Sequence, residues 1–585
     1  MAEIRNPNAS SPGSGGGDMR SMLIFTLLAL GALMAFQYFK PPVPPQAPAA
    51  SSPATHAPGL VPVTPAAASS SAARIQAVAE STTTVENDLY RITFTNRGAQ
   101  VKSWILKRYK DSHGHPLDLV NQAAASRFGL PLSLYTYEPE LTAQLNNVLY
   151  RPSVTGDVTA PTGIVFRYAD GPLEVTKTFL FNESYVIDVK VAVQQNGQYV
   201  RALVSWPSGL GDLEEAAQYN YTKFAFSSDG KRDTTAAKKI SGGATLNQPF
   251  DYAGLIDLYF GVTFLPATPA DASVVTLHGS MQVPRDANSP KGAELAEPVL
   301  GAAVGNQSGP THTRLFAGPL QYDVLGSIHT TAPDGKAVGE NLRPMIQYGW
   351  FKVIAEPLFL LLRYVHDHFI PNWGWSIIVV TLFFNLLMLP TRFTMMKSSL
   401  KMQRVQPKLD AIKRKYANLK ATDPRKAEMN AETMKLYKEE GINMYGGCLP
   451  LLVQMPLFFA YYRVLLNSIE LRQASWGWLP NLAAADPLHI LPILIIASMF
   501  LVQFITPSPG MDPAQRRMMA FMMPAIFGFS MWGFASGLAL YWATGNLLNI
   551  GLQLGINRSK LGRELNALAA KRAAAKGPRT IQARR

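Results

Sequence analysis

The sequence predicts an α-helical polytopic membrane protein with six transmembrane helices and one large antiparallel β-sandwich domain. Three observations predict this class. Long apolar stretches recur in the C-terminal part of the chain, whereas the N-terminal half is polar and carries short runs in which apolar residues alternate with polar ones. With 585 residues, the chain also exceeds a single compact core, so at least two independently packed regions are expected.

The first 80 residues predict a membrane anchor between two unstructured segments. Residues 1–21 are rich in Ser, Gly, Pro and Asn and are expected to form a disordered N-terminus. Residues 22–39 are apolar and would span about 27 Å as one transmembrane helix. A secretory signal peptide is the alternative, but no small-x-small cleavage site follows before Lys40, which favours an uncleaved anchor. Residues 40–80 are Pro/Ala/Ser-rich and predict a linker.

Residues 81–341 show the alternation that is typical of half-buried strands. Ile187, Val189 and Val191 alternate with polar neighbours, and turn signals such as Asn196-Gly197 separate the runs. We therefore expect a large antiparallel β-sandwich here. The only cysteine of the chain is Cys448, so the domain must fold without an intrachain disulfide or a cysteine-based zinc cluster.

From residue 342 to residue 370 the period becomes helical. Lys352, Glu356, Arg363 and Asp367 fall on one face, which predicts an amphipathic helix lying in the bilayer interface. A helix packed on the sandwich is the alternative. Within residues 371–557 the apolar stretches predict five further membrane helices, at about 375–390, 449–467, 490–506, 518–534 and 538–556.

The formal net charge is +14, and its distribution predicts the topology. Lys and Arg gather at 392–438 and at 558–585, beside apolar spans, as cytoplasmic loops require. Six spans then place both termini in the cytoplasm and the β-sandwich outside it. Apolar residues at helical spacing predict a cytoplasmic helical hairpin at 398–441, and 558–585 would be a basic cytoplasmic tail. Nucleic-acid binding is the alternative interpretation of this charge, as contact with ribosomal RNA.

The sequence offers little that is typical of an enzyme. No GxxxxGK[ST], HExxH or GxSxG motif occurs, and Cys448 lies at the head of an apolar segment, a poor setting for a nucleophile. His113-Gly-His115 and His366-Asp-His368 are weak metal candidates without a third ligand at an obvious spacing, and solvated histidines are the favoured interpretation. We therefore predict no catalytic residues, no metal and no cofactor.

One segment, Gly446-Gly447-Cys448-Leu449-Pro450 and onward to Ala460, closely resembles the signature of the YidC insertase family. Further landmarks occur in the family's order, and they include Asn372-Trp373-Gly374-Trp375, Lys401-Met402-Gln403, Glu470-Leu471-Arg472, Asp486-Pro487 and Gly537-Leu538-Ala539-Leu540-Tyr541-Trp542. The resemblance covers residues 342–557 with high specificity. It extends weakly to the β-domain through Lys177-Thr178-Phe179.

The resemblance implies a five-helix insertase core that encloses a hydrophilic groove, open to the cytoplasm and to lipid. It also implies a membrane protein insertase and chaperone of the bacterial inner membrane, acting alone or with the Sec translocon, with the β-domain in the periplasm. The partners would be nascent membrane proteins, the ribosome, the Sec translocon and the lipid bilayer, and no small-molecule substrate is expected.

Polar residues inside the predicted spans are the candidates for a client groove, because an unpaired polar group costs several kcal/mol in hydrocarbon. Hydrogen bonding between helices is the alternative role for each one alone. The family often has an arginine where this chain has Asn385. Arg392 lies seven residues further on, so two helical turns would place it on nearly the same face. Arg392 either supplies that charge or marks the cytoplasmic boundary. The candidates are Thr381, Asn385, Arg392, Gln454, Gln503, Tyr541, Trp542, Asn546, Asn549 and Gln553.

Two other functions compete with insertion. A secondary transporter would bind a small solute at midplane polar groups, but such proteins commonly show paired repeats, and we find no internal repeat. A periplasmic binding protein with a membrane anchor would explain the β-sandwich, but six spans exceed what anchoring needs.

Overall fold

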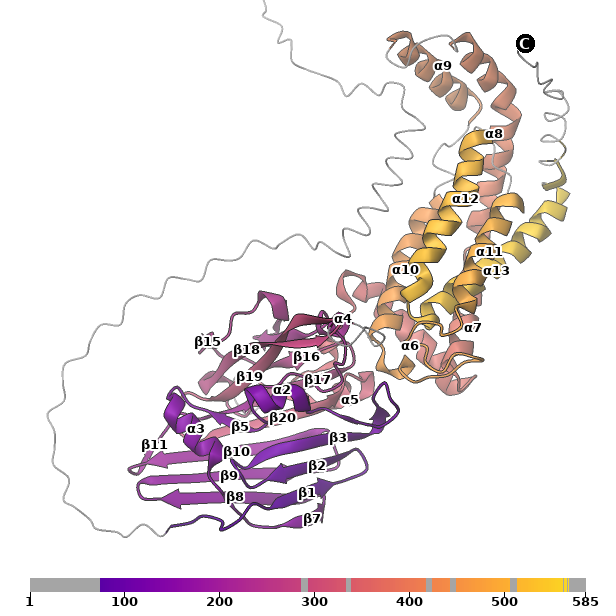
Figure 1. Cartoon of the computed structure of the whole chain (residues 1–585). Helices are drawn as coiled ribbons and strands as arrows, with labels where there is room; N and C mark the ends of the chain where they lie inside the picture. The colour runs from indigo at the N-terminus through magenta and orange to yellow at the C-terminus, as the bar shows by residue number, and fades with distance from the viewer. Residues whose placement is uncertain are drawn as a thin grey trace, which may run out of the picture. The chain divides into compact units, whose positions relative to one another are not determined.

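The computed structural model describes residues 74–285, 293–332, 338–416, 423–441, 449–505, 513–560, 562–564 and 567 (Figure 1). They divide into two compact units. Among the described residues, a β-rich unit holds 74–352 and 466–472, and a helical unit holds 353–465 and the residues from 473 onward. The predicted N-terminus, the anchor at 22–39, most of the linker and most of the basic tail lie outside the described residues.

The β-rich unit contains a ten-stranded sheet that is flanked by two five-stranded sheets. The large sheet has the order β14 (Lys231–Ala236), β13 (Lys223–Ser228), β16 (Tyr252–Ile256), β17 (Phe260–Pro266), β20 (Thr311–Pro319), β10 (Val186–Gln195), β9 (Leu173–Phe181), β8 (Thr162–Asp170) and β6 (Arg151–Pro152), with β11 (Gln198–Tyr199) paired to β10. Figure 1 shows β8, β9 and β10 running side by side.

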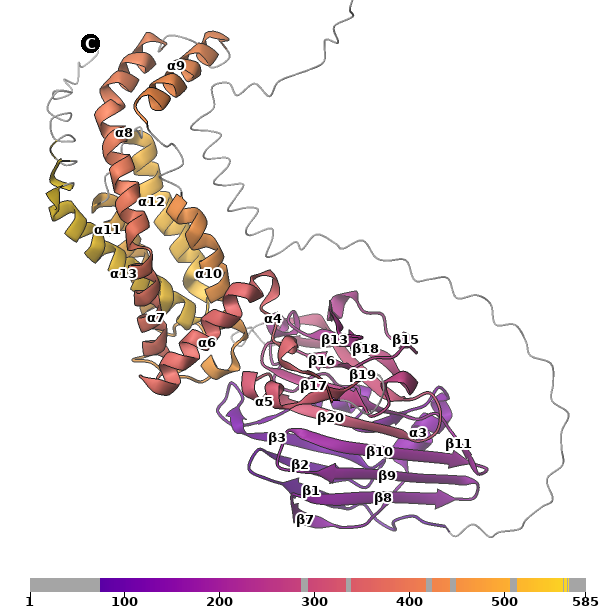
Figure 2. The same ribbon diagram turned by 180° about the vertical axis from the view of Figure 1, so that it is seen from behind.

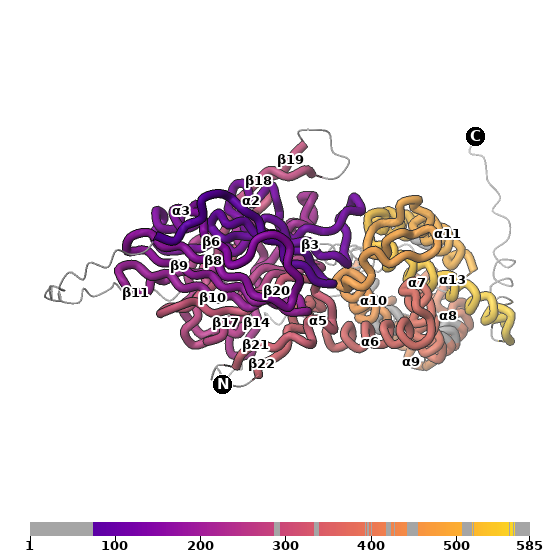
Figure 3. The backbone as a smooth tube through the Cα atoms, turned by 90° about the horizontal axis from the view of Figure 1, so that it is seen from below, coloured from indigo at the N-terminus to yellow at the C-terminus, as the bar shows by residue number. Residues whose placement is uncertain are grey.

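The smaller sheets complete the unit. One has the order β4 (Pro116–Asp118), β3 (Gln100–Lys110), β2 (Tyr90–Thr95), β1 (Thr82–Glu86) and β7 (Gly156–Thr159). The other has the order β15 (Thr245–Leu246), β18 (Ala272–Pro284), β19 (Glu294–Asn306), β12 (Leu203–Trp206) and β5 (Ser133–Tyr135), in which β18 and β19 form a long hairpin (Figure 3). A pair, β21 (His329–Thr331) and β22 (Val338–Asn341), and the short helices α2 (Gln122–Phe128), α3 (Pro139–Asn147), α4 (Ala216–Tyr219) and α5 (Tyr322–Ser327) fill the edges.

The core of this unit explains the alternation in its sequence. Ile187, Val189 and Val191 of β10 are buried, whereas the Lys190 between them is exposed. Phe94 of β2 packs on Phe179 of β9, with ring centroids 5.0 Å apart, so two sheets bury their apolar faces against each other. The predicted sandwich-like, β-rich domain is therefore confirmed.

The expectation of purely antiparallel pairing is wrong at one edge. Strands β1 and β7 pair in parallel, with Thr83 opposite Gly156 and Glu86 opposite Thr159. A tight hairpin can join only antiparallel strands, but β1 and β7 are separated by most of the first sheet and by α2 and α3, so the connection leaves the direction of pairing free.

The helical unit contains α6 (Lys352–His368), α7 (Trp373–Leu387), α8 (Leu389–Lys415), α9 (Arg425–Glu439), α10 (Leu449–Asn467), α11 (Ile490–Ile505), α12 (Pro513–Ser530) and α13 (Ser536–Arg558) (Figures 1 and 2). Helix α13 packs against α7 and α11, and α11 packs against α12. Within the described part of the chain, no helix combines the length and the apolar character by which a bilayer-crossing helix is recognised.

Helix α6 buries one apolar face, away from Lys352, Glu356, Arg363 and Asp367. The buried side chains are Ala355, Leu358, Phe359, Leu362 and Val365, whereas Trp350 and Ile354 are exposed. The helix also begins only at Lys352, because short 3-10 turns at Arg343–Met345 and Gly349–Phe351 precede it.

Helices α8 and α9 pack through Val405, Leu409 and Leu436. Ion pairs border this cluster, with Lys408 Nζ 2.6 Å from Glu440 Oε1 and Lys415 Nζ 2.5 Å from Glu432 Oε1. Helix α8 begins at Leu389, well before residue 398, and follows α7 with only Met388 between them (Figure 2).

Candidate functional site

One face of α13 carries a row of polar side chains. Trp542, Asn546, Asn549 and Gln553 are spaced by four, three and four residues, which places them in one stripe along a helix with 3.6 residues per turn. We call these four residues the α13 stripe. The stripe gathers four of the ten candidates from the sequence.

The opposite face of α13 is apolar and borders a cavity of about 550 Å³. Leu540, Ala543 and Leu547 of α13 line this cavity, together with Ile378 and Leu382 of α7 and Leu491 of α11. None of the ten candidates lines it. Helix α13 therefore separates an apolar cavity on one side from a polar stripe on the other.

Aromatic rings surround the N-terminal end of the stripe. The Trp542 ring stacks on Phe527 of α12, with centroids 4.4 Å apart, and meets Phe458 of α10 edge-on at 5.0 Å. Next to it, Tyr541 stacks on Tyr461 of α10 at 4.1 Å. The Gln454 side-chain amide donates a hydrogen bond of 3.0 Å to the Tyr541 hydroxyl. Three helices, α10, α12 and α13, thus meet at the Tyr541-Trp542 pair.

Further along, the stripe is joined to α11. The Asn546 side-chain amide donates to Ser498 Oγ at 3.0 Å. The Gln553 side-chain amide donates to Asn557 Oδ1 at 2.9 Å. Asn557 lies one turn further along α13, and its own amide donates to the carbonyl of Ile505 on α11 at 2.9 Å. Ser498 and Asn557 were missed by the sequence analysis, although Asn557 continues the spacing of the stripe by four residues.

The remaining candidates are less closely grouped. Thr381 is buried and donates to the Ile377 carbonyl, and Asn385 donates to the Thr381 carbonyl, both within α7. Gln503 is half-buried on α11. Arg392 belongs to α8, and its side chain is not described.

The prediction that Asn385 and Arg392 share a face assumed one continuous helix, but two helices meet between these residues. Helix α7 ends at Leu387 and α8 begins at Leu389, with Pro390 in its first turn. Proline has no N–H to donate to the preceding turn, so the ladder of hydrogen bonds is interrupted at this point. The seven-residue spacing from Asn385 to Arg392 therefore crosses a helix boundary, and the shared face stays a prediction.

Two buried polar atoms of the stripe have no hydrogen-bond partner among the described residues. They are Trp542 Nε1 and Asn549 Oδ1. Leaving such a group unpaired costs about 1–3 kcal/mol, and most buried polar groups are paired. Both atoms lie on the face that also holds Asn546 and Gln553, so the stripe has unused capacity for hydrogen bonding.

Comparison with known proteins gives two family matches that together cover most of the chain. Residues 82–361 match the family described as YidC periplasmic domain, and residues 364–563 match the family described as 60Kd inner membrane protein. Among relatives, membrane protein insertase YidC of Ralstonia nicotianae is 31% identical over 95% of this chain and 100% of its own length. The insertase of Citrifermentans bemidjiense is 30% identical over 92% of this chain and 99% of its own.

Solved structures of insertases are also similar to this chain, at low scores. An active YidC insertase with its first transmembrane domain resolved covers 81% of this chain and 94% of its own, at 16% identity and a TM-score of 0.32. The Thermotoga maritima YidC structure covers 80% and 99%, at 13% identity and a TM-score of 0.27.

A periplasmic β-rich domain followed by an inner-membrane helical domain defines the class of membrane protein insertases, which assist insertion without acting as enzymes. The chain belongs to the YidC family of these insertases. It is a membrane protein of the bacterial inner membrane, and its clients are membrane proteins. The resemblance noted in the sequence is confirmed.

Proposed function

We propose that clients enter the bilayer along the α13 stripe. The observation that carries this proposal is the pair of buried polar atoms, Trp542 Nε1 and Asn549 Oδ1, which have no partner among the described residues. Water or a polar client flank would supply those hydrogen bonds. A client whose polar flank is paired in this way crosses less hydrocarbon with its polar groups exposed, so the barrier to insertion falls.

The aromatic and amide groups around the stripe suit this task. Gln454 and Tyr541 offer polar edges beside the rings of Tyr461 and Phe458, and aromatic side chains with a polar handle bind mixed polar and apolar surfaces. We include Thr381, Asn385 and Gln503 in the same polar route, on the support of their residue types and partial or complete burial within α7 and α11.

A photo-crosslinker on the two faces of α13 tests this route. We expect a crosslinker at Asn549 to capture a stalled client, and one at the exposed Leu547, which lines the apolar cavity, to capture much less. Both positions lie on the same helix, two residues apart, on opposite faces, and Leu547 is the more exposed of the two. Capture at Leu547 with none at Asn549 would place the route in the cavity instead.

We further propose six transmembrane helices with both termini in the cytoplasm. Support comes from the anchor-like residues 22–39 and from α7 and α11, which contain no charged residue. Single cysteines in a Cys448→Ser background test this topology. Gln198, exposed on β11, should react with a membrane-impermeant thiol reagent in intact cells, and Lys413, exposed on α8, should react only after lysis. Labelling of Lys413 in intact cells would contradict the arrangement.

The ribosome and the Sec translocon are proposed partners. The segment 558–585 contains nine Lys and Arg and one acid, Glu564, a composition suited to ribosomal RNA. Truncation after Ile556 should weaken ribosome co-sedimentation, more so at low salt, where electrostatic binding is strongest. If the truncated and the full-length protein sediment equally with ribosomes at every salt concentration, the basic residues serve only as a signal for membrane topology. For the translocon, insertion of the same client with and without Sec would show whether it is needed.

For Arg392 we propose a supporting charge near the cytoplasmic end of the route. If it draws acidic client segments inward, Arg392→Ala should impair clients with acidic translocated tails more than neutral ones. Equal loss for both kinds of client would make Arg392 a boundary residue.

A further inference from the structure

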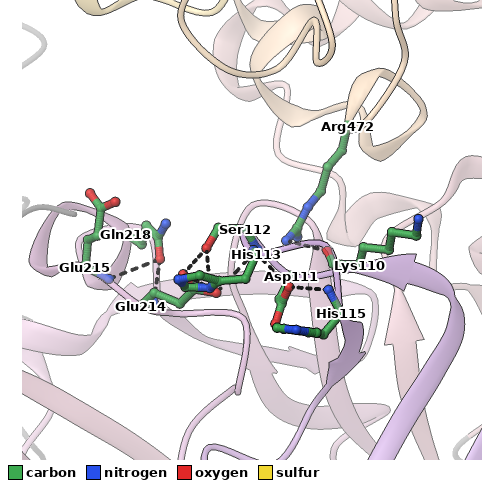
Figure 4. Close-up of polar contacts among 9 residues, drawn as sticks. All are labelled: Lys110, Asp111, Ser112, His113, His115, Glu214, Glu215, Gln218 and Arg472. Atoms are coloured by element: carbon green, nitrogen blue, oxygen red, sulfur yellow. Dashed lines mark hydrogen bonds and ion pairs between the residues drawn. The ribbon is translucent and has the colours of Figure 1, made fainter. Parts of the chain in front are cut away.

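The loop between β3 and β4 gathers histidine and carboxylate side chains at its tip. It contains Asp111, Ser112, His113, Gly114 and His115 (Figure 4). Asp111 Oδ1 accepts hydrogen bonds from the backbone N–H groups of His113 and His115, at 2.9 and 2.8 Å. The loop is thereby folded so that Asp111 Oδ2 faces His115 Nδ1, 3.4 Å away.

A fourth group comes from a distant part of the chain. Glu214 lies just before the N-cap of α4, and its carboxylate accepts a hydrogen bond from the Ser112 hydroxyl (Figure 4). His113 Nδ1 is 3.7 Å from Glu214 Oε2. The ligand atoms of Asp111, His113 and Glu214 all lie within 4.8 Å of one another. Sequence spacing alone shows only the histidine pair, because Glu214 is brought to it by the fold.

These distances are close to those of a metal centre. Zinc bonds to nitrogen and oxygen ligands are about 2.0–2.1 Å long, so a tetrahedral site holds its ligand atoms roughly 3.4 Å apart. The two nitrogen–oxygen separations of 3.4 and 3.7 Å are near this value. We propose that Asp111, His113 and Glu214 bind one divalent transition-metal ion of the zinc type, and that His115, whose Nδ1 is 3.4 Å from Asp111 Oδ2, moves in as a fourth ligand when the ion binds.

The charge and exposure of the four groups suit an exchangeable ion. The carboxylate side chains are only 25% and 29% exposed, whereas the imidazoles are 71% and 78% exposed, so solvent reaches the site from the histidine side. Two carboxylates and two neutral imidazoles form a ligand set that favours zinc over magnesium or calcium.

Arg472 holds the two halves of the site together. Its guanidinium pairs with Asp212, two residues before Glu214, at 3.4 Å. The same guanidinium donates to the carbonyl of Lys110, one residue before Asp111, at 3.5 Å (Figure 4). It also lies over the rings of Tyr259 and Phe260. Both chain segments that carry ligands are therefore fixed by one side chain, and ligands that are already in place lose less freedom when an ion binds.

The test is a titration of the purified full-length chain, in detergent, with Zn²⁺ alone. The protein carries a purification tag without histidine and is first treated with a chelator. Isothermal calorimetry should find one tight site in the wild type. The double variant His113→Ala/His115→Ala and the single variant Glu214→Gln should each bind at least about tenfold more weakly, since loss of even an outer partner of a metal ligand costs that much.

The second His-x-His pair supplies the matched control. His366 stacks on Trp373 and His368 contacts the Tyr364 carbonyl, and two residues apart on α6 they point to different sides of the helix. His366→Ala/His368→Ala should bind Zn²⁺ like the wild type. The unfolding temperature of His113→Ala/His115→Ala should match that of the wild type, because both altered histidines are exposed. A wild type without a stoichiometric site, or equal binding after His113→Ala/His115→Ala, would overturn the proposal.

Discussion

At the scale of single residues, the β-rich unit buries a lysine at its centre. Lys177 of β9 is fully buried, and its ammonium donates to the carbonyls of Gly98, Ala99 and Leu132 at 2.7, 3.1 and 2.8 Å. Burial lowers its pKa to about 7. Among the described residues no acid pairs with the group; three carbonyls and the ring of Tyr150, whose centroid is 5.7 Å from Nζ, surround it. The two loops that supply the carbonyls are thereby tied to one point.

We predict that Lys177→Met destabilises this unit by about 3 kcal/mol or more. The substitution keeps the apolar stem but leaves three buried carbonyls without their donor, and each such group costs roughly 1–3 kcal/mol. Chemical unfolding of the full-length protein, monitored by tryptophan fluorescence, measures the change. Lys190→Met, at an exposed position of β10, is the matched control and should change little. Similar stability of the two variants would contradict the role given to Lys177.

A second buried residue makes stability depend on pH. Burial raises the pKa of the Asp257 carboxyl well above its ordinary value, and the nearby Asp212 carboxylate adds to the effect. The folded state therefore holds this proton more tightly than the unfolded state. The contribution of Asp257 to stability is full below the unfolded pKa of about 3.9 and is lost as pH rises through the raised folded pKa.

Asp257→Asn should consequently stabilise the protein, and more so at about pH 8 than at about pH 5. The amide keeps the oxygen that accepts the N–H groups of Tyr259 and Phe260, both at 2.7 Å, but carries no charge. Thermal unfolding across this pH range gives the measurement, with Asp229→Asn at an exposed turn as control. A gain that shrinks as pH rises would show that the sign of the pKa shift is wrong.

At the scale of elements, α8 and α9 form a hairpin whose core is small. Leu409 is almost fully buried between Val405 and Leu436. Leu409→Ala should cost about 2–5 kcal/mol locally, the usual range for a core leucine. Hydrogen exchange should then speed up in α8 and α9 while the β-rich unit is unchanged. Met434→Ala, at an exposed position on α9, should leave exchange as in the wild type. Faster exchange throughout the chain would contradict independent packing of the hairpin.

The helices and strands also show which features of the fold can be predicted from the sequence. Polar residues at helical spacing on one apolar segment predict the α13 stripe, because periodicity survives any packing of the helix. Their partners cannot be predicted in this way. Ser498 and Tyr461 contact the stripe region only because α11 and α10 lie beside α13. Likewise, alternation predicts the strands of the sandwich but not the parallel pairing of β1 with β7, which depends on a long connection.

One proline, and contacts between residues far apart in sequence, account for the other differences between the sequence-based predictions and the structure. A seven-residue spacing suggests that Asn385 and Arg392 share a face, but Pro390 separates two helices there. The metal-ligand candidates His113 and His115 look isolated in the sequence, because Glu214 approaches them only through the fold and the brace of Arg472. Contacts between residues far apart in sequence have no local signal that a pattern could show.

At the scale of the whole molecule, a β-rich unit and a helical unit share one chain in an insertase of the bacterial inner membrane. We propose that insertion takes place along the helical unit, because the polar stripe lies there. Client transfer from water to lipid is itself favourable, so the protein needs only to lower a barrier, and it needs no bound nucleotide.

The central claim is that the α13 stripe lowers this barrier, and insertion into proteoliposomes that contain only the full-length chain tests it most directly. The initial rate of client insertion is compared for the wild type, for Asn546→Leu/Asn549→Leu, and for Thr544→Leu, a polar-to-leucine change on the cavity face of the same helix. We predict that the double variant inserts clients about tenfold more slowly than the wild type. This corresponds to an activation free energy that is higher by roughly 1.4 kcal/mol, about the contribution of one hydrogen bond. Thr544→Leu should insert at the wild-type rate. Full activity of the double variant, or an equal loss in Thr544→Leu, would contradict the account.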